Sequence, residues 1–165
     1  MARKAKTQQD EIFTLRLQRS APDLWPMLEA LYGGHPDYAG FCDRLLTALH
    51  SAWAARPADL RRLDLHRDLE PDWSLRPDRA GYVFYIDRFA GNLRNVLDKL
   101  DYLQELGITY VHLMPCLKPR PGDSDGGFSV MDYRAINPDL GTMEDLEQVA
   151  SALRDRGMNL CIDLV

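Results

Sequence analysis

Residues 81–115 decide the fold, and they read GYVFYIDRFAGNLRNVLDKLDYLQELGITYVHLMP. Two short runs of β-branched and aromatic residues, at 82–86 and 110–114, are typical of strands. Between them Asn92 can cap a helix whose apolar residues fall on one face, and Gly107 suits the turn that ends it. The stretch therefore predicts a strand–helix–strand unit.

The same pattern continues toward the end of the chain. Thr142 can cap a second helix, with Asp145 near its positive end, and Gly157 can close it. Residues 160–165 read as a third strand that is almost wholly apolar. Such strands are typical of parallel sheets covered by helices, joined by right-handed crossovers. We therefore predict the order β-α-β-α-β for residues 81–165.

The first 80 residues show helical spacing and no alternation of apolar and polar residues, so we predict a separate α-helical domain. Proline and glycine divide it, and an extended connector is expected where prolines cluster at 70–78. A helix of one or two turns is expected after the last break. The predicted helices begin near Ile12, at Ser20 ahead of Pro22, at Asp37 and after Pro57.

The charge pattern argues against a nucleic-acid partner. The chain has 165 residues, with 20 Lys and Arg against 25 Asp and Glu, and its net charge is −5. The excess of acidic residues lies entirely in residues 82–165, which would repel a phosphate backbone.

The cysteines and the N-terminus suggest a cytoplasmic protein. Cys42, Cys116 and Cys161 lie far apart and show no metal-ligand spacing, so we expect no disulfide framework, metal site or cofactor. No signal peptide or membrane span is predicted. Because the chain stops inside an apolar strand, we interpret it as the N-terminal part of a longer protein.

The loop at 116–137, which follows the second predicted strand, is the strongest candidate site, because connections of this length are often functional. Asp125 can hold a sugar hydroxyl or pair with a distant arginine, and Phe128 can stack on a pyranose ring. Gly126 and Gly127 can take positive φ and approach a ligand closely. The alternative is an ordinary solvated turn, which the residue types alone favour.

Two further carboxylates follow predicted strands. Asp87 and Asp163 can form an acid–base pair, but nothing in their spacing brings them together. The favoured interpretation is that each caps a neighbouring loop or pairs with a buried arginine. The histidines show no ligand pattern, and no phosphate-binding glycine loop is present. The four histidines are His35, His50, His66 and His112.

Several segments resemble the alpha-amylase superfamily, glycoside hydrolase family 13. Residues 106–115, LGITYVHLMP, resemble its second-strand motif. Residues 124–128, SDGGF, and 137–142, NPDLGT, resemble the loop and the helix start that follow. Residues 163–165 resemble the opening of its third-strand motif, which would continue into an Asn-His pair.

Within that superfamily the likeness is to the amylosucrases. It rests on residues 85–93, YIDRFAGNL, on the SDGG loop and on the helical part that ends in EPDW at 70–73. The resemblance implies an α-helical N-terminal domain, residues 1–80, followed by the first β-α-β-α-β portion of a (β/α)₈ TIM barrel, residues 81–165, truncated in the third strand.

The resemblance also implies an activity for the full-length protein: transfer of glucose from sucrose to an α-1,4-glucan, with release of fructose, by retaining double displacement. The catalytic carboxylates would lie beyond residue 165, so this chain would hold no catalytic residue and would be inactive alone. The implied partners are sucrose, the glucan and the remaining part of the same protein.

Each site residue receives a role from this resemblance. Asp125 would border the donor glucose and pair with a distant arginine, and Phe128 stands where the family usually has a stacking tyrosine. Gly126 and Gly127 would shape the loop, and Asp163 would support the arginine ahead of the nucleophile. Alternatives are another sucrose- or maltose-active member, such as a sucrose hydrolase or trehalose synthase, or a non-catalytic helical and α/β interaction module.

Overall fold

The computed structural model describes residues 7–123 and 125–165. The chain divides into two compact units, and the boundary falls between Pro71 and Asp72. None of the helices in the described residues has the length and apolar character required to cross a bilayer.

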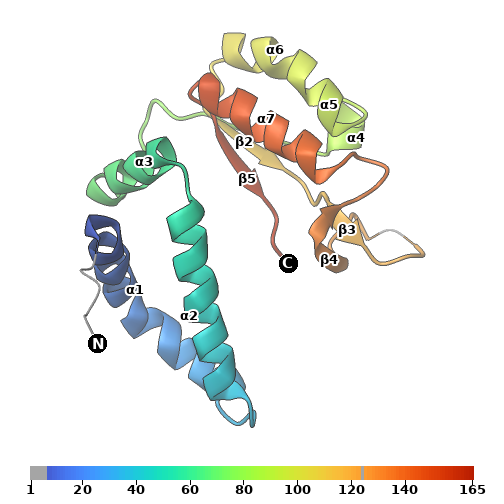
Figure 1. Cartoon of the computed structure of the whole chain (residues 1–165). Helices are drawn as coiled ribbons and strands as arrows, with labels where there is room; N and C mark the ends of the chain where they lie inside the picture. The colour runs from blue at the N-terminus through green and yellow to red at the C-terminus, as the bar shows by residue number, and fades with distance from the viewer. Residues whose placement is uncertain (1–6, 124) are drawn as a thin grey trace. The chain divides into compact units, whose positions relative to one another are not determined.

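The first unit is helical and contains α1 (Gln8–Tyr32), α2 (Tyr38–Ala55) and α3 (Ala58–Leu69), as Figure 1 shows. The predicted helix at Asp37 and the break at Pro57 are confirmed. The helix after that break has 12 residues, which is longer than the one or two turns expected.

The predicted break ahead of Pro22 is wrong, because α1 runs through both Pro22 and Pro26. Each proline removes one backbone N–H from the helical ladder and bends the helix, but it need not end it when neighbouring helices pack against it. Here α1 packs against α2, and this contact stabilises the helix across its two prolines.

Polar contacts tie the helical unit together. Among its described residues only Trp53 is buried; the indole N–H donates to the Gln9 carbonyl at 3.1 Å, and the guanidinium of Arg16 lies over the indole ring. Arg56 donates to both carboxylate oxygens of Asp64, at 2.6 and 2.8 Å. Burial by itself would raise the pKa of Asp64, but the hydrogen bond and charge of Arg56 outweigh it and lower that pKa.

The second unit contains a parallel sheet in the order β1 (Gly81–Phe84), β2 (Tyr110–Leu113), β5 (Asn159–Ile162). The predicted β-α-β-α-β order is confirmed. Its helical segments are α4 (Ile86–Phe89), α5 (Leu93–Val96), η1 (Leu97–Lys99), α6 (Leu100–Glu105) and α7 (Met143–Asp155).

The predicted start of α7 is confirmed in detail. The Thr142 hydroxyl accepts from the Asp145 N–H, and the Asp145 carboxylate accepts from the Thr142 N–H, which is a capping box. The side chain of Asp145 is 4% exposed and accepts from Arg94 at 2.7 Å. This hydrogen bond to Arg94 is the main reason that the pKa of Asp145 is lowered.

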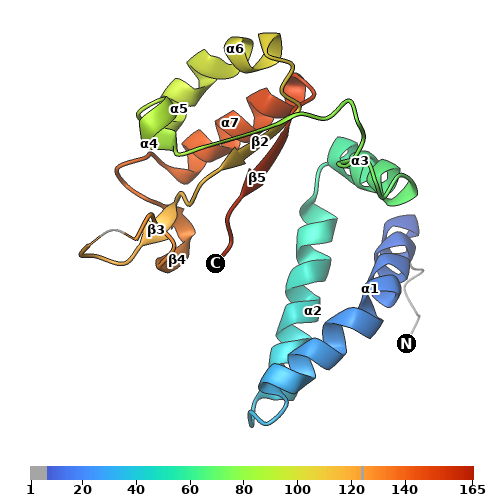
Figure 2. The same ribbon diagram turned by 180° about the vertical axis from the view of Figure 1, so that it is seen from behind.

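The two faces of the sheet differ. Phe84, Val111 and Leu113 belong to the buried apolar cluster between the sheet and its helices. Figures 1 and 2 show these helices on one side of the strands. Since side chains alternate along a strand, the register neighbours Val83, His112 and Cys161 lie on the opposite face. None of these three residues is fully buried.

Three predictions for this unit need correction. The first strand, predicted over 82–86, ends at Phe84, and Ile86 begins α4. The segment predicted as a loop contains an antiparallel ribbon of β3 (Leu117–Pro119) and β4 (Val130–Ile136), whose pairing satisfies backbone groups that a loop would leave to solvent. The third parallel strand ends at Ile162, before the predicted Val165. Asp163 therefore follows this strand directly instead of lying within it.

Candidate functional site

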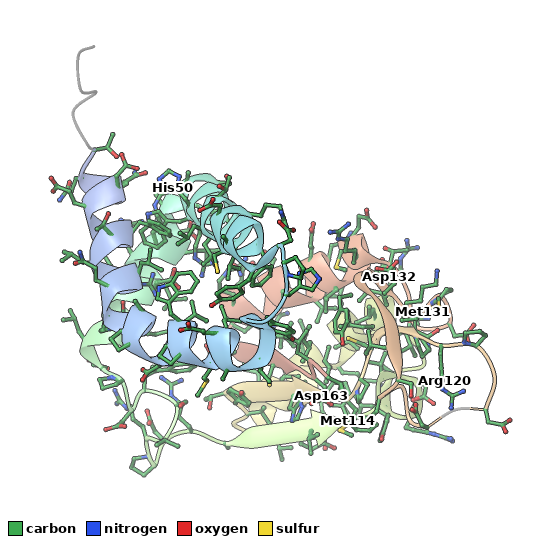
Figure 3. All side chains as sticks on the ribbon, turned by 90° about the horizontal axis from the view of Figure 1, so that it is seen from below. His50, Met114, Arg120, Met131, Asp132 and Asp163 are labelled. Atoms are coloured by element: carbon green, nitrogen blue, oxygen red, sulfur yellow. The ribbon has the colours of Figure 1, made fainter. Side chains whose placement is uncertain are left out.

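The candidate site lies where the three parallel strands end. Phe84, Leu113 and Ile162 are in register, so the next residues, Tyr85, Met114 and Asp163, lie at the same edge. Figure 3 labels two of them, Met114 and Asp163, at this edge. In folds built on parallel strands, ligands bind at the carboxyl ends.

The loop that carries Asp125 folds back onto this edge. Gly126 and Gly127 have φ angles of 85° and 86°, so the predicted positive φ is confirmed. A Cβ on Gly126 would lie 3.2 Å from the Tyr85 hydroxyl, and one on Gly127 would lie 3.2 Å from the Pro115 Cβ. The loop therefore lies close to Tyr85 and Pro115, and a side chain at either glycine would be tightly packed and strained by the positive φ.

Asp125 and Phe128 flank these glycines. The Asp125 carboxylate accepts from the Ser129 hydroxyl and from the Gly127 N–H, at 3.1 Å for the latter. The hydrogen bond from Ser129 is the largest cause of its lowered pKa. The side chain of Asp125 is exposed and that of Phe128 is 40% exposed, so both can meet a ligand.

These contacts also bear on the simpler interpretation of the loop as a turn. The hydrogen bond from Gly127 to Asp125 is a local turn contact of the expected kind. An ordinary turn does not account for the close approach of Gly126 to Tyr85, because the loop lies between β3 and β4 whereas Tyr85 follows β1. The arginine partner expected for Asp125 would come from outside this chain.

Asp87 and Asp163 have separate partners, but neither partner is the buried arginine that was expected, since Arg88 is exposed and Asp163 pairs with a histidine. Asp87 lies 3.3 Å from Arg88, and Asp163 Oδ1 lies 2.9 Å from His112 Nε2. Sequence reasoning missed His112, because its partner is 51 residues away. No local pattern indicated this pair. In the structure, the strand register places His112 on the face away from the core, one layer below the strand ends.

The Cys116 thiol, which follows Met114 and Pro115, is not an activated nucleophile. Burial, with a further contribution from the charge of Asp163, raises the pKa of the Cys116 thiol to about 11, so the thiol stays protonated at neutral pH. In residues 7–123 and 125–165, no group of His, Cys, Asp or Glu side chains is arranged to hold a metal ion. The exposed carboxylate of Asp125 can accept hydrogen bonds, and the exposed ring of Phe128 offers an apolar face.

A comparison with protein families agrees with this architecture. Residues 11–165 match the model of the alpha-amylase catalytic domain. The chain belongs to the alpha-amylase family. This family comprises glycoside hydrolases and transferases with a TIM-barrel catalytic domain. The parallel sheet and the Asp-Gly-Gly loop are therefore parts of such a domain.

Curated relatives match part of the chain. An oligo-1,6-glucosidase from Bacillus cereus is 43% identical over 75 residues, which cover 46% of this chain and 13% of that protein. The alpha-amylase mde5 from Schizosaccharomyces pombe is 40% identical over 81 residues, which cover 46% of this chain and 16% of that protein. The chain thus spans less than a fifth of the length of these relatives.

Among solved structures, an isomaltulose synthase from Erwinia rhapontici in complex with sucrose is 32% identical, with a TM-score of 0.47. The match covers 53% of this chain and 17% of the other.

Proposed function

We propose that the protein containing this chain is an amylosucrase-like glucosyltransferase, which transfers glucose from sucrose to an α-1,4-glucan and releases fructose. Membership of the alpha-amylase family supports a reaction at a glucoside. The observation that supports the proposal is the close approach of Gly126, which lies between Asp125 and Phe128, to the Tyr85 hydroxyl at the carboxyl edge of the sheet.

These residues would bind the donor glucose. A carboxylate only accepts hydrogen bonds, so Asp125 would accept from glucose hydroxyls and from a guanidinium supplied by the rest of the protein. The exposed ring of Phe128 would cover one face of the pyranose. It has no hydroxyl, so it would supply contact area and no hydrogen bond.

The bond-breaking groups would come from outside this chain. Retaining transfer needs a carboxylate nucleophile and a carboxylic acid about 5–5.5 Å apart. In the proposed barrel these would follow later strands, beyond residue 165. The 165-residue chain alone is therefore expected to release no fructose from sucrose.

The second candidate is another glucoside-active member of the family, such as a sucrose hydrolase, a trehalose synthase or an α-glucosidase. The 43% identity with an oligo-1,6-glucosidase over 75 residues favours this candidate. A non-catalytic interaction module is the remaining alternative. Product analysis separates the three. Transfer from sucrose yields glucan and fructose, hydrolysis yields free glucose, a trehalose synthase converts maltose to trehalose, and a module yields no product.

The deciding experiment measures sucrose consumption and products for the protein that contains this chain. Asp125→Ala is expected to lower turnover by orders of magnitude while the protein stays folded, because the donor pocket loses its charged acceptor. The matched control is Asp123→Ala, an exposed carboxylate of the same loop, which should keep parental turnover. Parental turnover in Asp125→Ala would contradict the pocket assignment.

The aromatic position gives a second prediction. Phe128→Ala should weaken sucrose use because the stacking face is lost, whereas Phe128→Tyr should keep or improve it. Steady-state kinetics with sucrose distinguish the two variants. Equal kinetics for Phe128→Ala and the parent would show that the ring does not contact the donor.

A further inference from the structure

We propose that His112 is a positioning residue of this site and that it acts through Asp163. The inference rests on the proposed function, since it concerns the same strand edge. It adds a residue for which neither the sequence pattern nor the family match gives a role.

The contact joins two strands at the edge of the site. His112 lies in β2, Asp163 follows β5, and Nε2 lies 2.9 Å from Oδ1. Their side chains are 33% and 23% exposed, so solvent competes only partly for the bond. A carboxylate only accepts, so Nε2 must carry the proton, and the bond fixes both the tautomer and the ring orientation.

The register explains why this bond can position Asp163. His112 lies one side-chain layer below the row of Tyr85, Met114 and Asp163, on the face that the helices do not cover. It therefore holds the carboxylate from below and from a neighbouring strand. The bond engages Oδ1, and Oδ2 can accept a donor from above, such as the arginine that Asp163 is proposed to support.

A small displacement of such a carboxylate has a large effect on turnover. A misplacement of about 1 Å in a catalytic arrangement can cost roughly a hundredfold in rate. Without the histidine, Asp163 is free to adopt other side-chain rotamers, and the arginine that it supports loses its fixed partner. The expected loss therefore falls on kcat, while contacts that bind the substrate ground state remain.

The chain provides a matched control in a second His–Asp pair. His50 Nε2 lies 3.1 Å from Asp10 Oδ1 in the helical unit. The side chains of this pair are 50% and 37% exposed, and Asp10 belongs to the capping box of α1. The two pairs have similar geometry, but only the His112 pair lies at the strand ends.

The test uses the protein that contains this chain, with His112→Leu, His112→Gln and His50→Leu. His112→Leu should lower kcat for sucrose about tenfold to a hundredfold, as loss of a partner that orients an active-site group commonly does, with KM within about twofold. Glutamine places an amide N–H near the position of Nε2, so His112→Gln should recover most of kcat. His50→Leu should keep parental kinetics.

Each other outcome overturns the inference. Parental kcat in His112→Leu does so, and so does a loss in His112→Gln equal to that in His112→Leu, since a merely structural role predicts no rescue. A parent protein that acts on no glucoside overturns the proposed function and this inference together. An active parent with an unaffected His112→Leu overturns the inference alone.

A measurement on the unmutated histidine covers the case in which His112→Leu does not fold. In ¹H–¹⁵N correlation spectra of the imidazoles, His112 should show a slowly exchanging Nε2 proton, which Asp163→Ala abolishes. The exposed His35 supplies the reference for a solvent-exchanged ring. A His112 spectrum like that of His35, or one unchanged by Asp163→Ala, overturns the inference.

Discussion

Ion pairs and hydrogen bonds hold the helical unit together, whereas buried apolar side chains hold the α/β unit. Apart from Trp53, the described residues of the helical unit are exposed or half-buried, and Leu69 is 83% exposed. In the α/β unit an apolar cluster links the sheet with α5, α6 and α7, and Leu103 within it is fully buried.

This difference shows that the two units should respond to different perturbations. Half-exposed ion pairs contribute little each and are screened by salt. The stabilisation from apolar burial is proportional to the area removed from water and does not depend on charge. A cavity should therefore lower the stability of the α/β unit, and high salt should lower the stability of the helical unit.

The largest effect is expected from a cavity in the α/β unit. Leu103→Ala should lower the free energy of unfolding by about 2–5 kcal/mol, because the lost contacts leave a void that the surroundings cannot fill. Denaturant titration followed by circular dichroism measures the change. Leu69→Ala is the control and should stay within about 0.5 kcal/mol; equal losses in both variants would contradict the comparison.

A smaller effect is expected from breaking the Arg56–Asp64 pair. Arg56→Met should lower the free energy of unfolding of the helical unit by about 1.5 kcal/mol, the usual contribution of hydrogen bonds to a charged group. Arg16 stays 3.6 Å from Asp64 and limits the loss. Titration at low and at molar salt tests the assignment, since a gap between parent and variant that does not shrink in salt would speak against an electrostatic origin.

The capping boxes test the same comparison at a smaller scale, because each unit has one. Thr142→Ala should cost about 1 kcal/mol and Thr7→Ala about 0.5 kcal/mol, the lower part of the usual range for caps. The box at Thr142 is partly buried, whereas that at Thr7 is exposed to solvent. Thermal unfolding of both variants measures the difference, and a larger loss in Thr7→Ala would reverse the order proposed here.

Acid should weaken both boxes. Hydrogen bonds from Thr7 hold the pKa of Asp10 below its usual value, and the hydrogen bond from Arg94 does the same for Asp145. A lowered folded pKa stabilises the fold at pH above the unfolded value of about 4, and this contribution is lost as pH falls through the folded value. The gap between Thr142→Ala and its parent should thus be full at pH 7 and shrink below pH 4. A constant gap down to pH 2 would count against this.

Sequence reasoning succeeded where local chemistry decides the structure. Thr142 caps its helix and Gly107 has positive φ, as expected from their own residue types and nearest neighbours. It failed at Pro22, where packing between helices outweighs a local break. It also failed at Lys118, which pairs with Asp132 in a ribbon that the local sequence did not indicate.

The candidate site was predictable to a similar extent. The residue types of the loop indicated Asp125 and Phe128 as candidates, but the contact of Gly126 with Tyr85 depends on strand register. The His112–Asp163 bond has the same origin. Contacts between residues tens of positions apart need the three-dimensional register, which no local pattern contains.

The parallel register also determines when the strands can pair during synthesis. The contact between His112 and Asp163 spans 51 residues. At about 5–20 residues per second a ribosome needs roughly 3–10 seconds to make such a stretch. During that interval the edge of β2 that later pairs with β5 has no partner strand, and an unpaired strand edge is a template for other chains. The nascent protein thus exposes this edge to other chains after β2 has formed and before β5 emerges, whereas the helices that precede it can already have folded.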